Sequence, residues 1–157
     1  MIEVVETRVA SAQAALLRGP ARKAYESFLD ELAHRGCAAL GYRVTGPAPL
    51  PRLCVRHLRD NDRVVVAFEG PERAWIVLVG PHEHTDPGRN VYDALYHLAG
   101  TWPTDNTRRT KPSCCDPRTG TPPSADAEVI DDLVRRARSL ARGSRRLWSL
   151  GGPGTFP

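Results

Sequence analysis

The sequence lacks any apolar run approaching the roughly 18–20 residues that a membrane-spanning helix requires, so we predict no membrane partner. Its beginning, MIEVVETRVA, lacks the basic start and the long apolar core of a secretory signal, which favours a cytoplasmic protein. In that compartment thiols stay reduced. We therefore expect no disulfide framework among the four cysteines, Cys37, Cys54, Cys114 and Cys115.

Several cofactor and metal motifs are also missing. The chain has no Walker loop and no GxGxxG after a predicted strand. Cys114 and Cys115 are adjacent and do not form the two CxxC pairs of a zinc ribbon. His82 and His84 alternate and Asp86 follows, but no further ligands lie nearby in the sequence. We predict neither a metal nor a cofactor.

The charge is unevenly distributed. The chain has 157 residues, enough for one domain with a real core, and a net charge of +4. Residues 1–100 carry 12 basic and 12 acidic side chains, whereas residues 101–157 carry 10 and 6. The basic C-terminal part indicates an acidic partner or a contribution to solubility.

Three apolar runs of strand length are present: Leu53 to Leu58, Val64 to Phe68, and Trp75 to Val79. Short polar connections of hairpin length separate them, which predicts an antiparallel meander. Ile2 to Val5 is a candidate first strand, and Gly41 to Pro51 is predicted to be a loop because it contains three prolines and two glycines.

Helical spacing precedes the meander. A first helix is expected from Thr7 to Gly19-Pro20, and a second from Pro20 to Arg35-Gly36. We expect the two to form an antiparallel hairpin that covers one face of the sheet. The predicted fold class is therefore α+β, with two N-terminal helices packed on a small antiparallel sheet and a C-terminal helical extension.

The C-terminal part is predicted in three pieces. A short helix in Arg89 to Ala99 closes a first domain, residues 1–100. Residues 101–125 are rich in proline and are expected to be a linker or a loosely held arm. Residues 126–157 contain a helix from about Ala127 to Arg142 and an end that frays. This helix either folds back on the domain, which its apolar stripe favours, or serves as an arm for ribosomal RNA.

An ordered set of motifs spans about residues 2–99. The stretch from Gly46 to Arg52 leads into a basic strand, and Arg63 opens the apolar strand Val64 to Phe68. Val79-Gly80-Pro81-His82 ends the next strand, and Tyr92 follows. In this order the chain resembles the RelE/ParE superfamily, the toxins of type II toxin–antitoxin systems.

That resemblance implies two alternative activities. The RelE branch is similar to ribosome-dependent endoribonucleases that cut mRNA and inhibit translation, and the ParE branch inhibits DNA gyrase without catalysis. Either implies a cognate antitoxin as partner. Asp62, where the family commonly has an aromatic residue, and the lack of lysine in the meander motivate a third alternative, a non-toxic interaction protein.

The nuclease chemistry assigns roles to particular residues. The ribose 2′-oxygen attacks phosphorus, so protons must move and charge must be neutralised. His82 is the expected general acid or base, since histidine titrates near neutrality. Arg56 and Arg63 are the expected phosphate binders. Tyr92, or Tyr96 one turn later, is expected to orient the substrate. Each of these residues could instead be an ordinary surface or core side chain with no catalytic role.

Three more basic residues flank these positions. Arg52 and Arg59 are expected to contact the RNA backbone or the ribosome. His57 is the third RNA-binding candidate, although it alternates with Arg56 along its strand and is therefore expected on the opposite face of the sheet.

Overall fold

The computed structural model describes residues 1–47, 49–82, 90–100 and 111–142, and the side chains as far as residue 136. These ranges form a mixed α+β fold. The helices and strands in chain order are β1 (Glu3–Glu6), α1 (Arg8–Ala14), α2 (Gly19–Arg35), η1 (Gly36–Ala39), β2 (Tyr42–Arg43), η2 (Leu50–Arg52), β3 (Leu53–His57), β4 (Asp62–Glu69), β5 (Arg73–Pro81), α3 (Val91–Ala99) and α4 (Ala127–Arg142).

One five-stranded sheet organises the fold, in the order β1-β5-β4-β3-β2. The predicted antiparallel meander is confirmed, because β3 pairs with β4 and β4 pairs with β5 in antiparallel register. The first strand is also confirmed, but β1 pairs with β5 in parallel. The prediction of a loop over Gly41 to Pro51 was wrong at its start, where Tyr42 and Arg43 pair with β3 and form the edge strand β2.

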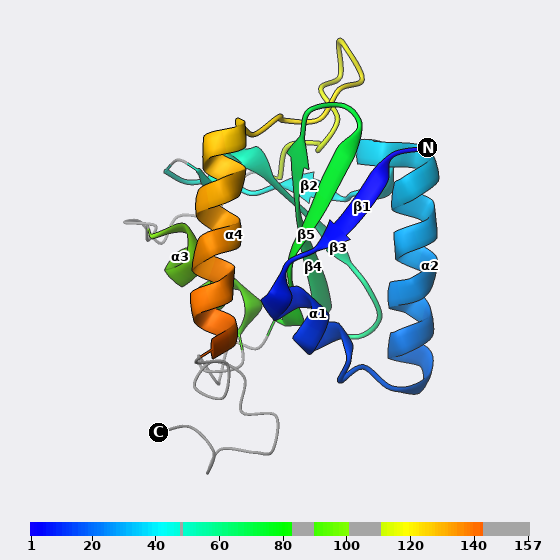
Figure 1. Ribbon diagram of the computed structural model, residues 1–157. Coiled ribbons are helices and arrows are strands. Elements are labelled where there is room, and N and C mark those ends of the chain that lie inside the picture. The colour runs from blue at the N-terminus through cyan, green and yellow to red at the C-terminus, as the bar shows by residue number, and fades with distance from the viewer. Residues whose placement is uncertain (48, 83–89, 101–110, 143–157) are drawn as a thin grey trace.

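Helices cover the two faces of the sheet separately (Figure 1). Side chains alternate between faces along a strand, so β4 contributes Val64 and Val66 to one side and Val65 and Ala67 to the other. On the first side, the α2 face, the sheet packs against Tyr25, Phe28 and Leu32 of α2. On the second, the α3/α4 face, it packs against apolar residues of α3 and α4, which are Val91, Ala94, Leu95, Leu98, Ile130 and Leu133.

Helix α1 is shorter than predicted, ending at Ala14, and it packs on β5 and α4. Its anchor is Thr7, whose hydroxyl accepts from the Ala10 N–H at 3.1 Å and donates to the Val77 carbonyl at 2.8 Å. Val77 is the extra residue of a β-bulge, since the register jumps between Leu78 and Ile76. The bulge holds α1 at the sheet. Helix α1 therefore contributes Val9 to the core cluster on the α3/α4 face and Ala14 to the cluster on the α2 face. It does not pair with α2 as the expected hairpin over one face.

The described part of the Pro-rich region is fastened to the sheet rather than loosely held. We call residues 111–126 the connecting segment. It bridges to β2 through Ser113 and Tyr42, and to β4 through Ser124 and Phe68. The Ala125 N–H donates to the Phe68 carbonyl at 2.8 Å. The segment thereby covers the open edge of the sheet at β2 and leads into α4.

The prediction of reduced cysteines was wrong in this structure, which pairs all four. Cys37 bonds to Cys115 and Cys54 bonds to Cys114. Cys114 and Cys115 are adjacent in the sequence, but their disulfides connect to two different elements, η1 through Cys37 and β3 through Cys54. Together the disulfides fix the connecting segment to the α2 side of the sheet.

Helix α4 follows its predicted limits and folds back on the domain, with Ile130 and Leu133 buried in the same cluster as Leu95. The alternative of a free arm is therefore not what this structure adopts. Among the described residues, no helix is long and apolar enough to cross a membrane.

Candidate functional site

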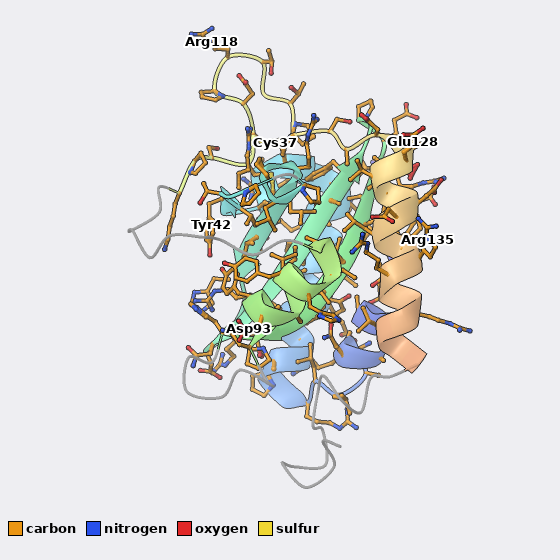
Figure 2. All side chains as sticks on the ribbon, turned by 90° about the vertical axis from the view of Figure 1, so that its left-hand side faces the viewer. Cys37, Tyr42, Asp93, Arg118, Glu128 and Arg135 are labelled. Carbon is orange, nitrogen blue, oxygen red and sulfur yellow. A yellow bond between two sulfur atoms is a disulfide. The ribbon has the colours of Figure 1, made fainter. Side chains whose placement is uncertain are left out.

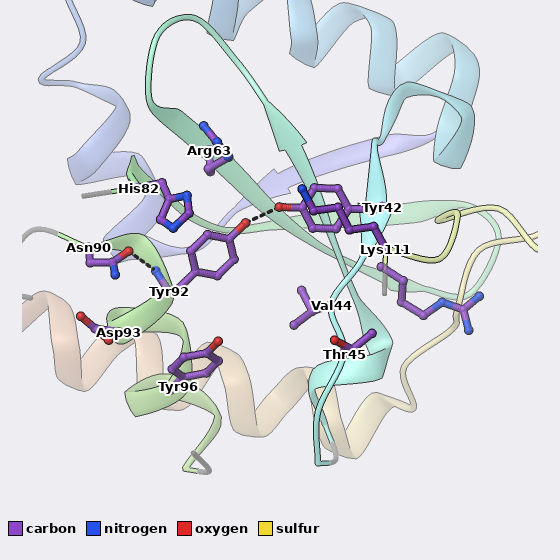
Figure 3. Close-up of a pocket in the computed structure, with 11 residues that line it drawn as sticks. Tyr42, Val44, Thr45, Arg63, His82, Asn90, Tyr92, Asp93, Tyr96 and Lys111 are labelled. Atoms are coloured by element: carbon purple, nitrogen blue, oxygen red, sulfur yellow. Dashed lines mark hydrogen bonds between the residues drawn. The ribbon is translucent and has the colours of Figure 1, made fainter. Parts of the chain in front are cut away.

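A pocket of about 420 Å³ lies on the α3/α4 face, between β2, β4 and the start of α3 (Figure 3). Its walls come from segments far apart in the sequence. The lining residues are Tyr42, Arg43, Val44, Thr45, Arg63, His82, Asn90, Tyr92, Asp93, Tyr96 and Lys111. Three of the four residues predicted to be catalytic, Arg63, His82 and Tyr92, are among them.

The meander brings Arg63 and His82 together. Asp62 pairs with Pro81 in the antiparallel register, so the start of β4 lies beside the end of β5. The N–H of His82 donates to the Asn61 carbonyl at 2.8 Å, which holds the residue after β5 against the β3–β4 turn. Both pocket positions therefore follow from strand pairing.

Tyr92 enters the pocket from the first turn of α3. Asn90 caps this helix, because its side-chain oxygen accepts from the Tyr92 N–H at 3.1 Å. The rings of Tyr92 and His82 meet edge to face, with centroids 4.7 Å apart and planes at 75°. The hydroxyl of Tyr92 also hydrogen-bonds to that of Tyr42 (Figure 3).

Burial strengthens the preference of the Tyr92 phenol for its neutral form. Loss of solvent raises the pKa of its phenol above the usual value, and the hydrogen bond with Tyr42 raises it further, whereas the Arg63 guanidinium acts in the opposite direction. Tyr92 is therefore a neutral phenol near neutral pH, suited to donate or accept hydrogen bonds and unsuited to act as a phenolate base.

The charge facing the pocket is mainly positive. Within the described chain, no carboxylate forms an ion pair with Arg63, which donates to the carbonyl of Asp62 at 3.3 Å and hydrogen-bonds to the Tyr92 side chain. Burial, and next the charge of Asp60, raises the pKa of the Asp62 carboxyl, while Arg63 lowers it. Lys111 adds a second cation, and Asp93 is the one carboxylate among the lining residues.

The prediction that Arg56 acts beside Arg63 was wrong. Arg56 lies on the α2 face, with its guanidinium 5.8 Å from the ring centroid of Phe28. It forms an ion pair with Glu31 at 3.3 Å and donates to the Ala39 carbonyl. Strand alternation explains the separation: Arg56 pairs with Val64, so it shares the face of Val64 and not that of Arg63.

The flanking basic residues lie outside the pocket lining. His57 pairs with Arg63 and so points to the same face, as alternation predicts, but it is exposed and its ring nitrogen contacts the Asp60 carbonyl. Arg59 is exposed in the β3–β4 turn. Arg52 donates to the Ser124 carbonyl at 2.6 Å and so holds the connecting segment.

The candidate metal pattern of His82, His84 and Asp86 cannot be placed as a set, because His84 and Asp86 lie outside the described residues. Elsewhere in the described ranges, no three His, Cys, Asp or Glu side chains are grouped in a way that would hold a metal ion.

Sequence reasoning missed Tyr42 and Lys111. Tyr42 fell in a stretch assigned to a loop on its proline and glycine content, although Tyr42-Arg43-Val44 is itself β-prone. Lys111 fell in the Pro-rich region, and only the pairing of its neighbours with β2 brings it to the pocket. Tyr96, the expected alternative to Tyr92, lines the pocket with it.

No protein-family model, curated protein or solved structure matches this chain. The resemblance to the RelE/ParE superfamily therefore stays a prediction from the sequence motifs.

Proposed function

We propose that the chain is a RelE-like toxin, a metal-independent endoribonuclease that cuts mRNA at the ribosome. One observation carries the proposal: Arg63, His82 and Tyr92, chosen from three separate motifs, line a single pocket. The order of a strand, two helices and an antiparallel meander, with the site at the end of the meander, also supports it.

The reaction is the attack of a ribose 2′-oxygen on the adjacent phosphorus. A bond forms from that oxygen to phosphorus, the bond to the 5′-oxygen breaks, and the products are a 2′,3′-cyclic phosphate and a 5′-hydroxyl. The 2′-proton must leave and the departing 5′-oxygen must gain one. This route needs positioned cations and a proton carrier, and no metal is required for it.

The pocket residues suit these steps. Arg63 presents a guanidinium that can bind two phosphoryl oxygens as charge develops on them. His82 gives or takes the proton, because imidazole titrates near neutral pH. Tyr92, a neutral phenol, orients the substrate by hydrogen bonding or stacking and packs edge to face with the His82 ring.

A toxin of this kind requires a cognate antitoxin. An antitoxin would block RNA by covering the pocket, and the exposed His57 at the end of β3 and Arg59 in the β3–β4 turn are basic residues that it could contact.

Induced expression in a bacterial host tests the proposal, with primer extension on several abundant transcripts. Wild type is compared with His82→Ala and with Arg56→Met as a matched control outside the pocket. We expect defined cuts within coding regions for wild type and Arg56→Met, and none for His82→Ala. Growth arrest without cuts that persists in His82→Ala would contradict the proposal and favour inhibition of DNA gyrase. No arrest and no cuts would favour a non-toxic interaction protein.

A further inference from the structure

Lys111 lies at the far side of the pocket from Arg63 (Figure 3). Its Nζ stands 5.2 Å from the ring centroid of Tyr42, a cation–π distance. In the part of the chain that the structure describes, no carboxylate pairs with this ammonium group. Among the described residues, this positive charge is left to an anionic ligand.

The backbone around Lys111 is firmly held. The Arg43 N–H donates to the Pro112 carbonyl at 2.7 Å, and Ser113 forms an antiparallel bridge with Tyr42. Cys114 and Cys115 follow at once and are both in disulfides. The hydrogen bond, the bridge and the disulfides of residues 112–115 thus fix the backbone position of Lys111 beside β2.

Arg43 does not duplicate this charge. It pairs with Cys54, whose side chain belongs to the α2 face, so the Arg43 side chain is directed to that face. Arg43 also lines the pocket, but among the described lining residues Arg63 and Lys111 are the two cations that strand pairing does not direct to the α2 face, and the Tyr42 and Tyr92 rings lie between them (Figure 3).

We infer that Lys111 is a second phosphate-binding residue of the pocket, one that binds a phosphate flanking the scissile phosphate of single-stranded RNA. The inference rests on the proposed function. A single strand whose scissile phosphate meets Arg63 carries its neighbouring phosphates along the same backbone. Cations separated by aromatic rings match that pattern, because the cations track the backbone and the rings stack with bases.

Binding of a short single-stranded RNA with 2′-O-methyl riboses tests this role, since the substrate lacks the attacking hydroxyl and stays intact. Affinity is measured over a range of salt concentrations for wild type, Lys111→Ala and Lys111→Arg. Arg118→Ala is the matched control, because Arg118 is an exposed cation of the same segment at its outer tip, away from Tyr42 (Figure 2).

We expect Lys111→Ala to weaken binding roughly threefold to fivefold. The slope of log affinity against log salt should fall by about 0.7, the value for one phosphate contact on a single strand. Lys111→Arg should restore both quantities, and Arg118→Ala should leave both unchanged.

Each failure has its own signature. If Lys111→Ala and Arg118→Ala behave alike while Arg63→Met weakens binding, the role of Lys111 is overturned and the proposed function stands. If wild type binds no RNA, the role of Lys111 is overturned, and cleavage on programmed ribosomes decides the proposed function separately. Mass spectrometry with and without reduction, together with circular dichroism, checks that each variant keeps its disulfides and its fold.

Discussion

The hydroxyl of Tyr42 hydrogen-bonds to the hydroxyl of Tyr92, which joins the edge strand β2 to the first turn of α3 across the pocket. The two residues are 50 positions apart in the chain. Because Tyr92 also touches the His82 ring, the pair links the edge of the sheet to the expected proton carrier. Its contribution to the fold and to the site can be measured separately.

A double-mutant cycle measures the contribution to the fold. Tyr42→Phe and Tyr92→Phe each remove one hydroxyl and leave the ring, so each should lower the free energy of unfolding by about 1 kcal/mol. The double variant should lose less than the sum of the two single losses, because both changes break the Tyr42–Tyr92 bond, while Tyr92→Phe also removes the hydrogen bond to Arg63. Urea denaturation provides the three values, and additive losses would show that the hydroxyls do not interact.

Alkaline pH should weaken the fold through the buried phenols. Burial raises the pKa of Tyr92, and its hydrogen bond with Tyr42 raises it further. Burial likewise raises the pKa of Tyr25, and its hydrogen bond with Glu6 adds to the effect. A raised folded pKa gives stability that is complete below the unfolded value of about 10 and is lost as pH rises above it. Tyr92→Phe should therefore lose less stability than wild type between about pH 9 and 12. Parallel curves for the two proteins would refute this.

Arg56 and Arg63 should have opposite phenotypes. Arg56→Met removes the ion pair with Glu31 and the bond to the Ala39 carbonyl at a group one-third exposed, so we expect a loss of about 1–2 kcal/mol in unfolding free energy. Its RNA cleavage should be unchanged. Arg63→Met should abolish cleavage and change stability little. Denaturation and cleavage assays on both proteins test these roles. Loss of cleavage in Arg56→Met would show that Arg56 contributes to the catalytic site after all.

Reduction should weaken the protein without unfolding it. The disulfides close separations of 78 and 60 residues, and on the chain-entropy estimate each stabilises by about 4 kcal/mol. The backbone bonds of the connecting segment and the buried Ile130 and Leu133 remain in the reduced protein. We expect a lower urea midpoint with reductant and no effect of reductant on a variant with all four cysteines changed to serine. Four alkylatable thiols in protein purified without reductant would contradict the pairing.

The sequence predicted the local elements well because their signals are local. The meander was predicted from apolar runs of strand length and short polar turns, and α4 begins and ends at its predicted residues, Ala127 and Arg142. Arg63, His82 and Tyr92 share a pocket because they stand at strand ends and a helix start that the meander brings together.

The errors concern long-range pairing. The face of Arg56 depended on its register with Val64, which no pattern in β3 alone reveals. The disulfides of Cys37 and Cys54, and the approach of Lys111 to Tyr42, depend on how residues 111–126 cross the edge of the sheet. The high proline content of that segment predicted a loosely held arm, whereas hydrogen bonds to β2 and β4 hold it against the sheet.

The most direct measurement of the central claim is cleavage of a labelled mRNA by the purified protein on programmed ribosomes, with analysis of the new RNA ends. Wild type and His82→Ala are compared on an all-ribose RNA and on one with a 2′-O-methyl group at the cut site. We predict that wild type cuts the ribose RNA, leaves a 2′,3′-cyclic phosphate, and fails on the methylated RNA, and that His82→Ala cuts neither. Cutting of the methylated RNA, or equal cutting by His82→Ala, would contradict the account.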